Sequence, residues 1–160
     1  YDLAIHRIAE LAPVRICEGE RISGAATLGI SITHNVPAKY HGEYLFGSVS
    51  HLTIDFEKVL KYGVDHIRHE AEAAYVKHKG TEREAFALSC IRSLDSFKIW
   101  HERYLEALKE LEGYDSNYNN LKNVPFAPAS NFYEAVAVFC KQGLLHSNVA
   151  GFADAVFGAA

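Results

Sequence analysis

Histidines are the side chains in this sequence whose type and position most readily suggest chemistry. His51 comes shortly before a predicted helix start, because Thr53 and Asp55 are good N-cap residues and apolar side chains recur from Phe56 at intervals of three and four. A loop residue there can present its imidazole to a pocket while packing holds the helix behind it. The alternative is a helix start with a solvated histidine, and spacing alone leaves both open.

The other histidines give weaker signals. His66 and His69 lie three residues apart beside Glu70, but the sequence has no H-E-x-x-H and no Glu-x-x-His to support a metal site. We therefore expect no metal and place both histidines on the surface or facing a neighbouring helix. His146 and Ser147 are adjacent after a helix end, which says nothing about a triad because a triad is set by geometry.

Two further patterns have ordinary structural explanations. Phe97, Trp100 and Tyr104 recur at helical spacing, which is typical of core packing rather than of a cofactor site. The stretch Gly24–Gly29 contains neither G-x-G-x-x-G nor G-K-[ST], so it gives no indication of phosphate binding.

Composition and charge exclude several classes of protein. The 160 residues carry a formal net charge of −4, and the basic residues are scattered. Nucleic-acid binding needs clustered positive charge, so we expect no nucleic-acid partner. No run of about 18 apolar residues occurs, and the chain opens without a basic and apolar leader. These features predict a soluble protein with no membrane contact.

Cysteine and methionine usage indicates the compartment and the extent of the chain. Cys17, Cys90 and Cys140 lie far apart without a C-x-x-C motif, and an odd number of isolated cysteines is typical of a reducing cytoplasm. The sequence has no methionine, even at position 1, and begins within a helical pattern. We interpret it as a piece of a longer protein.

The first third of the chain is predicted to contain a helix end, a short strand or hairpin and a long loop. Residues 1–12 read as the last turns of a helix that Pro13 stops. The alternation of Val14–Ile22 predicts a short strand or hairpin with a turn at residues 18–20. Residues 25–50 form a long irregular loop, and loops of that length in compact proteins are usually functional or cover another part of the protein.

Two long helices are predicted next. The first runs from Asp55 to Lys79, with Gly80 as the C′ residue. The capping box Thr81–Glu84 starts the second, which reaches Gly113, and the two should form an antiparallel hairpin. The apolar stripe of the second helix comprises Phe86, Cys90, Ile91, Leu94, Phe97, Trp100, Tyr104, Leu105, Leu108 and Leu111.

The C-terminal part is predicted as a loop followed by a third helix. Residues 115–129 are polar and contain two prolines, which favours a loop. Asn131 with Glu134 should cap a helix that reaches about Leu145. The fold class is therefore mainly α with a few short strands.

Four segments resemble a known family in the family's order. Ser50–Leu60, followed by Gly63, resembles the G-H-x-x-x-D-Y-E-K-V-L…G segment of the glycyl radical enzymes, the pyruvate formate-lyase superfamily, and especially its dehydratase and lyase branch. Glu20–Gly24 resembles D-E-L-I-V-G, and Glu102–Tyr104 resembles E-R-Y. The stretch Val124–Pro128, with Phe132–Ala135 after it, is similar to V-P-x-x-P…F-x-E-A.

This resemblance implies that residues 1–160 are a single region from the N-terminal part of such an enzyme. The parent would be a ten-stranded β/α barrel in an anaerobic cytoplasm, with a radical carried by a loop cysteine and a C-terminal glycine and installed by a radical SAM activase. His51, His146 and Ser147 would hold the hydroxyl groups of a small substrate. Phe152 stands where the family's H-S-x-x-x-G-R-x-D has arginine, and Ser50 where it has glycine.

The same resemblance implies that this piece is inactive alone. The radical glycine motif is missing, and no cysteine here has the context of the catalytic one, so we expect no catalytic residue and no bound cofactor in this segment. The implied partners are a small polar substrate, the activase, the remainder of the barrel and a second copy in a homodimer. The alternative is a free-standing helical binding or interaction domain without catalysis, in which every apolar stripe would be buried.

Overall fold

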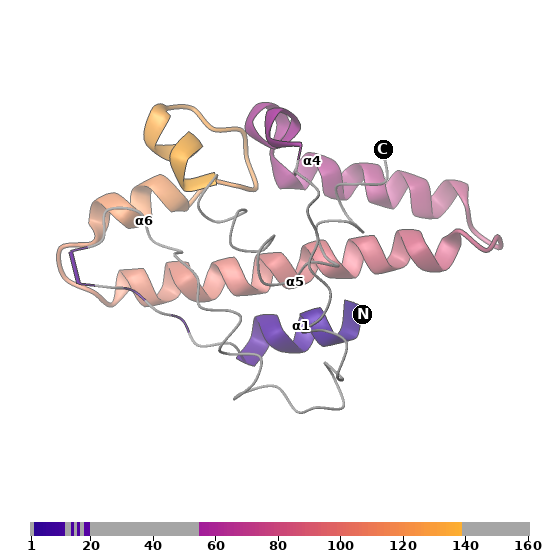
Figure 1. Cartoon of the computed structure of the whole chain (residues 1–160), viewed down its shortest axis with the longest axis horizontal. Coiled ribbons are helices and arrows are strands. Elements are labelled where there is room, and N and C mark those ends of the chain that lie inside the picture. The colour runs from indigo at the N-terminus through magenta and orange to yellow at the C-terminus, as the bar shows by residue number, and fades with distance from the viewer. Residues whose placement is uncertain (1, 12–13, 15, 17, 20–54, 139–160) are drawn as a thin grey trace.

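The computed structural model describes residues 2–11, 14, 16, 18–19 and 55–138, and what it describes is helical. The elements are α1 (Asp2–Leu11), α4 (Phe56–Lys77), α5 (Glu84–Lys109) and α6 (Asp115–Leu121), and residues 132–138 are helical too (Figure 1). No strand occurs among these residues. Val14 and Ile16, for which we predicted a strand, lie outside any, whereas Gly19 is in a turn as expected, with φ 74°.

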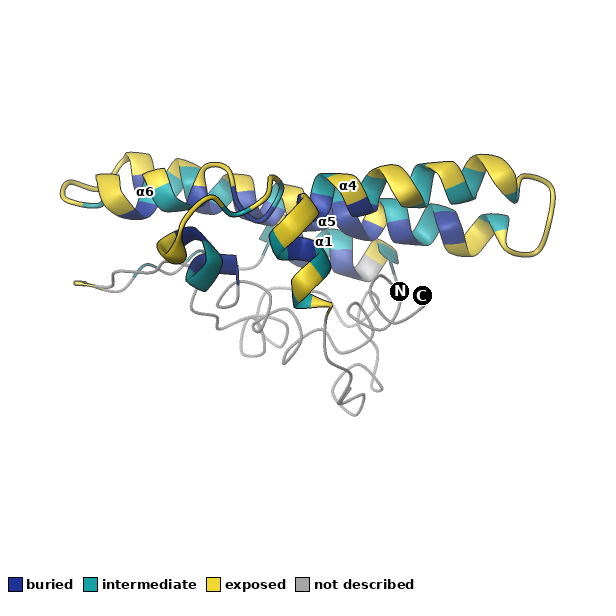
Figure 2. Cartoon of the chain, turned by 90° about the horizontal axis from the view of Figure 1, so that it is seen from above, coloured by how far each residue is buried: buried dark blue, intermediate teal, exposed yellow. Residues whose placement is uncertain are grey.

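The long helix α5 is the element against which the others pack. α4 and α5 lie side by side and form the predicted antiparallel hairpin (Figure 1). α1 lies along the other side of α5, and α6 follows the C-terminal end of α5 (Figure 1). Buried residues are concentrated where α5 runs beside α4 and α1 (Figure 2). None of the helices described is long and apolar enough to cross a membrane.

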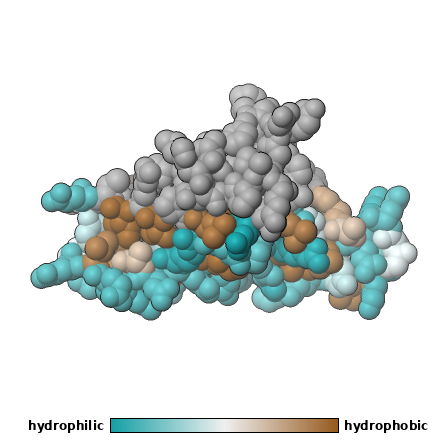
Figure 3. All heavy atoms as spheres, turned by 90° about the horizontal axis from the view of Figure 1, so that it is seen from below, coloured by the Kyte–Doolittle hydropathy of each residue, from teal (hydrophilic) through white to brown (hydrophobic). Residues whose placement is uncertain are grey.

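The apolar stripe of α5 forms the centre of the core. Six of its members are buried: Cys90, Leu94, Phe97, Trp100, Tyr104 and Leu108. Phe86 and Leu111, at the two ends of the stripe, are 49% and 41% exposed. On the face seen from below, apolar residues gather in several places along the described part of the molecule, with polar residues between them and along one edge (Figure 3).

Polar contacts fix α1 and α4 on α5. Arg103 donates from Nη1 to the backbone oxygen of Ala9 at 2.7 Å, and its burial lowers the pKa of the guanidinium. Arg68 on α4 donates from Nε to Asp95 on α5 at 2.7 Å and from Nη1 to Glu72 at 2.6 Å. The Asp95 hydrogen bond is the main cause that raises the pKa of Arg68.

The turn between α4 and α5 differs from the predicted capping box. α5 begins at Glu84, three residues after Thr81, whose hydroxyl donates to the His78 carbonyl at 2.6 Å instead of capping N3. The Glu84 carboxylate accepts from the backbone N–H of Gly80 at 2.7 Å. A capping box would use the N–H of the next residue, Thr81. Gly80 has φ 77°, which only glycine adopts without cost, so it is the turn residue expected after α4.

The prediction of a loop over residues 115–129 is wrong for its first half. Residues Asp115–Leu121 form α6, and its residues Asn117 and Leu121 are buried. Asparagine has a weak helix propensity, but packing against α5 stabilises the helix. The next cap is confirmed: Asn131 Oδ1 accepts from the Glu134 N–H at 3.0 Å, and the Glu134 carboxylate accepts from the Ser130 N–H at 2.6 Å.

Candidate functional site

The first turns of α4, which follow His51 in sequence, are set apart from the rest of the helix by a kink. Gly63 has φ 78° and ψ 165°, a backbone conformation that interrupts the helix. The amides released by the kink find partners 61 residues away: Val64 N–H donates to the Pro125 carbonyl at 2.8 Å and Asp65 N–H to the Phe126 carbonyl at 3.2 Å. The helix is therefore broken without leaving these buried donors unpaired.

Only glycine fits at the kink. Gly63 is buried, and a Cβ built on it would lie 2.1 Å from the Phe126 carbonyl oxygen, far inside contact distance. That oxygen belongs to backbone, which cannot rotate away as a side chain can. Position 63 is the last glycine of the G-H-x-x-x-D-Y-E-K-V-L…G pattern quoted above, and the close approach of the Phe126 carbonyl gives a physical reason for a glycine there.

A third backbone hydrogen bond ties residues 124–129 to the part of α4 before the kink. Ala129 N–H donates to the Leu60 carbonyl at 3.1 Å. An uninterrupted helix would use that carbonyl for Val64 N–H. Segment 124–129 therefore holds α4 on both sides of Gly63 and takes the place of the missing helical bonds.

Phe126 attaches the same segment to α5. Its ring lies 5.4 Å from that of Phe97 and 5.0 Å from that of His101, measured between centroids, and the Lys98 ammonium lies 5.7 Å from its centroid. The rings meet at tilted angles, the usual arrangement for packed aromatic side chains. The kink of α4, segment 124–129 and the middle of α5 therefore form one packed unit.

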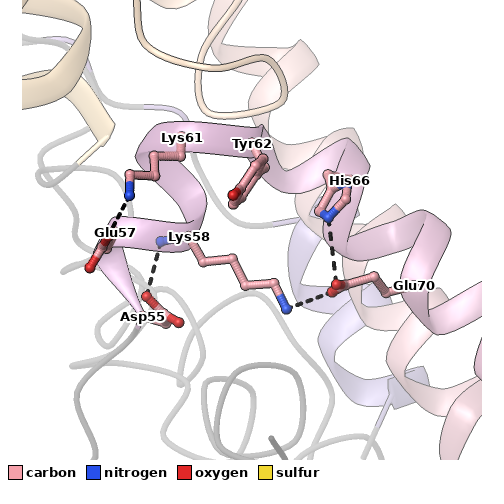
Figure 4. A pocket seen from close by; sticks show the side chains of 7 residues that line it. All are labelled: Asp55, Glu57, Lys58, Lys61, Tyr62, His66 and Glu70. Atoms are coloured by element: carbon pink, nitrogen blue, oxygen red, sulfur yellow. Dashed lines mark hydrogen bonds and ion pairs between the residues drawn. The ribbon is translucent and has the colours of Figure 1, made fainter.

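The start of α4 is also fixed by its cap and by an ion pair. Asp55 accepts from the Lys58 N–H at 2.9 Å, which confirms it as the N-cap (Figure 4). Lys58 Nζ lies 2.7 Å from Glu70 Oε2, so this pair also spans the kink, and His66 Nε2 lies 3.5 Å from the other oxygen of Glu70. Lys61 pairs with Glu57 at 2.6 Å, and the hydrogen bond to Glu57 raises the pKa of Lys61.

These side chains line an open groove of about 490 Å³ beside the first turns of α4. Its lining consists of Asp55, Glu57, Lys58, Lys61, Tyr62, His66 and Glu70 (Figure 4). Within the groove both lysines are paired with glutamates, as described above. The ring centroids of Tyr62 and His66 lie 5.0 Å apart. The groove can therefore orient a polar group, and no nucleophile with an adjacent base occurs among its described lining residues.

The three residues predicted to bind substrate, His51, His146 and Ser147, lie outside the described residues, as does the loop 25–50. The structure describes the helix start that follows His51, beginning at Asp55. His66 and His69 are exposed, as expected. No group of three metal-ligating side chains occurs within the described part of the chain.

Sequence reasoning missed the contact between Gly63 and segment 124–129. The available signals were a glycine inside a helical pattern and a proline-rich stretch, but nothing in the spacing pairs the two. Of the three cysteines, the structure describes Cys90, which is buried, and burial is the main cause that raises the pKa of its thiol.

Comparison with known proteins shows which family this chain resembles. Residues 38–148 match the family model described as PFL-like, Pyruvate formate lyase-like. A structure described as "1,2-propanediol Dehydration in Roseburia inulinivorans; Structural Basis for Substrate and Enantiomer Selectivity" matches with TM-score 0.68 and 17% identity over 88% of this chain and 28% of that one. The glycerol-bound form of the B12-independent glycerol dehydratase from Clostridium butyricum matches with TM-score 0.69 and 16% identity over 99% of this chain and 31% of that one.

These comparisons differ in what they establish. Searching the curated proteins finds no match. At 16–17% identity the two solved structures show a shared fold, and this chain spans less than a third of the length of either. The family match covers well over half of the chain and includes both sides of the Gly63 kink and segment 124–129. The chain therefore belongs to the pyruvate formate lyase-like family.

Proposed function

We propose that this chain is the N-terminal, pocket-wall portion of a glycyl radical dehydratase or lyase that acts on a small polar substrate. The observation that carries the proposal is the match of residues 38–148 to the Pyruvate formate lyase-like family. The radical glycine and the catalytic cysteine would come from the rest of the parent, together with the remainder of the barrel, so this portion alone would be inactive. An activase, a homodimer and a cytoplasmic location belong to the same proposal.

The chemistry assigned to this portion is substrate binding. In the parent, a protein radical would supply hydrogen-atom abstraction from an unactivated carbon, which acid–base groups cannot perform. His51, His146 and Ser147 would hydrogen-bond the substrate's hydroxyl groups, orient the carbon to be attacked and assist the departure of water. Because the two similar solved structures concern 1,2-propanediol dehydration and a glycerol dehydratase, small polyols are the first substrates to test.

The exposed apolar side chains support a portion that needs a partner surface. Phe132 and Tyr133 are 76% and 64% exposed and stack edge to face at 6.0 Å, at the start of the helix over residues 132–138. Two neighbouring exposed aromatic side chains offer an apolar surface that a partner can cover. In the parent, the remainder of the barrel would cover them.

The alternative, a free-standing helical binding domain without catalysis, has one specific observation in its favour. The centre of the α5 stripe is already buried by α1 and α4, as a self-contained domain requires. In that case the polar groove at the start of α4 would be the binding site. Flanking coding sequence separates the two proposals, because only the enzyme requires a downstream cysteine and a terminal radical-glycine motif.

The decisive experiment is His51→Ala in the parent enzyme, assayed with glycerol and 1,2-propanediol after activation. We expect turnover to fall by about tenfold to a hundredfold, as expected for losing a substrate-orienting hydrogen bond, with the protein still folded. His69→Ala is the matched control, because that histidine is exposed and lies outside the groove. A His51→Ala enzyme that folds poorly while its soluble fraction keeps full specific activity would refute the substrate-binding role.

A further inference from the structure

We propose that Gly63 and segment 124–129 form a positioning joint that sets the direction of residues 56–62 relative to residues 64–77 of α4. Three observations carry it. The kink at Gly63 releases Val64 and Asp65 N–H, segment 124–129 accepts from both, and the same segment donates to Leu60 before the kink. The residues on the two sides of the kink are therefore hydrogen-bonded to the same segment, 124–129.

The joint is rigid because three different types of contact coincide there. The Phe126 carbonyl leaves no room for a Cβ at position 63. The Phe126 ring is anchored on Phe97 and His101 of α5. The Lys58–Glu70 ion pair at 2.7 Å connects the first turn of α4 to the part beyond the kink. Rotation of residues 56–62 would break the Ala129–Leu60 hydrogen bond and the Lys58–Glu70 ion pair, while the ring packing holds segment 124–129 on α5.

The joint gives the first turns of α4 a direction that the helix alone would not have. Without the kink, Val64 N–H would bond to the Leu60 carbonyl and α4 would continue straight. Residues 56–62 would then point along the axis of 64–77, and Asp55 would move with them. Gly63 is accordingly a positioning residue for the first turns of α4 and their N-cap, Asp55.

Gly63→Ala tests the joint in the 160-residue chain by amide hydrogen exchange. Alanine favours the right-handed helical region, so it either straightens α4, returning the Leu60 carbonyl to Val64 N–H, or pushes segment 124–129 outwards. Both outcomes remove the partner of the Ala129 amide. We expect Ala129 to exchange about tenfold faster, the effect of losing one hydrogen bond, while the Leu94 amide in the middle of α5 keeps its rate.

Gly80→Ala is the matched control. Gly80 has φ 77°, almost the value at Gly63, but a Cβ there meets nothing within 4 Å. It imposes the same backbone penalty without touching the joint, so Ala129 exchange should not change. Equal rates at Ala129 in the wild type and in Gly63→Ala would overturn the proposal, and so would equal acceleration by Gly80→Ala.

A second variant keeps the test decisive if Gly63→Ala fails to fold. Phe126→Ala removes the ring that attaches the segment to α5 and leaves the backbone carbonyls in place. The joint requires that the Ala129 amide and the Val59 amide, which donates to Asp55, exchange faster together. Acceleration of Ala129 alone would overturn it. None of these experiments measures catalysis. The test of the joint is therefore independent of whether His51→Ala changes the activity of the parent enzyme.

Discussion

Leu94 and Leu111 belong to one apolar stripe in the sequence, yet truncating them should have very different effects on stability. Leu94 is 1% exposed in the core, whereas Leu111 is 41% exposed beyond the end of α5. Leu94→Ala removes a fully buried side chain and leaves a cavity, for which about 3–4 kcal/mol of unfolding free energy is expected. Leu111→Ala removes a side chain that is already partly in contact with water and leaves almost no cavity. The expected loss of unfolding free energy is therefore about 1 kcal/mol or less.

Urea unfolding of the two variants measures the difference directly. The single tryptophan, Trp100, is buried in the same core, so its fluorescence reports loss of packing around α5. For a chain of this size each kcal/mol corresponds to roughly 2–4 °C in the melting temperature, so the two variants should melt several degrees apart. Equal losses of stability for Leu94→Ala and Leu111→Ala would refute the packing described here, because they would mean that α1 and α4 do not cover the middle of α5.

Two further predictions concern Cys90 and the cap at Asn131. Burial raises the pKa of the Cys90 thiol, so the folded state holds its proton more tightly than the unfolded state. Its contribution to stability is present below the unfolded pKa of about 8.5 and lost as pH rises through the higher folded value, and Cys90→Ala should flatten that part of a stability–pH profile. An identical profile in both proteins would contradict this. Asn131→Ala removes the acceptor for Glu134 N–H and should cost about 1 kcal/mol in thermal unfolding, whereas Asn119→Ala, on the exposed side of α6, should cost less than half of that. Equal costs would contradict the cap.

Local signals in the sequence located the main helices of the described part. Pro13 follows the end of α1, Asp55 caps α4, and Asn131 caps the helix that begins at residue 132. Caps depend on a few neighbouring residues, and an apolar stripe depends on helical period alone, so both can be predicted without knowing the rest of the fold. The hairpin of α4 and α5 follows from their short connection and matching stripes.

Long-range contacts account for what the sequence did not predict. α6 forms from a polar, asparagine-rich segment because packing buries Asn117 and Leu121, and no local signal announces that packing. The capping box at Thr81 matched a motif, yet the turn uses Gly80 N–H instead, because the tight connection from α4 brings that amide to Glu84.

The sequence by itself determined a family resemblance, a mainly helical chain and the residues that cap and line its helices, since these depend on motifs and on spacing within single segments. Only the tertiary structure decided that α4 is broken at Gly63 and held there by the carbonyls of Pro125 and Phe126. The reason is physical: a backbone hydrogen bond between residues 61 positions apart carries no side-chain signature, so it becomes visible only when the folded chain brings both segments together.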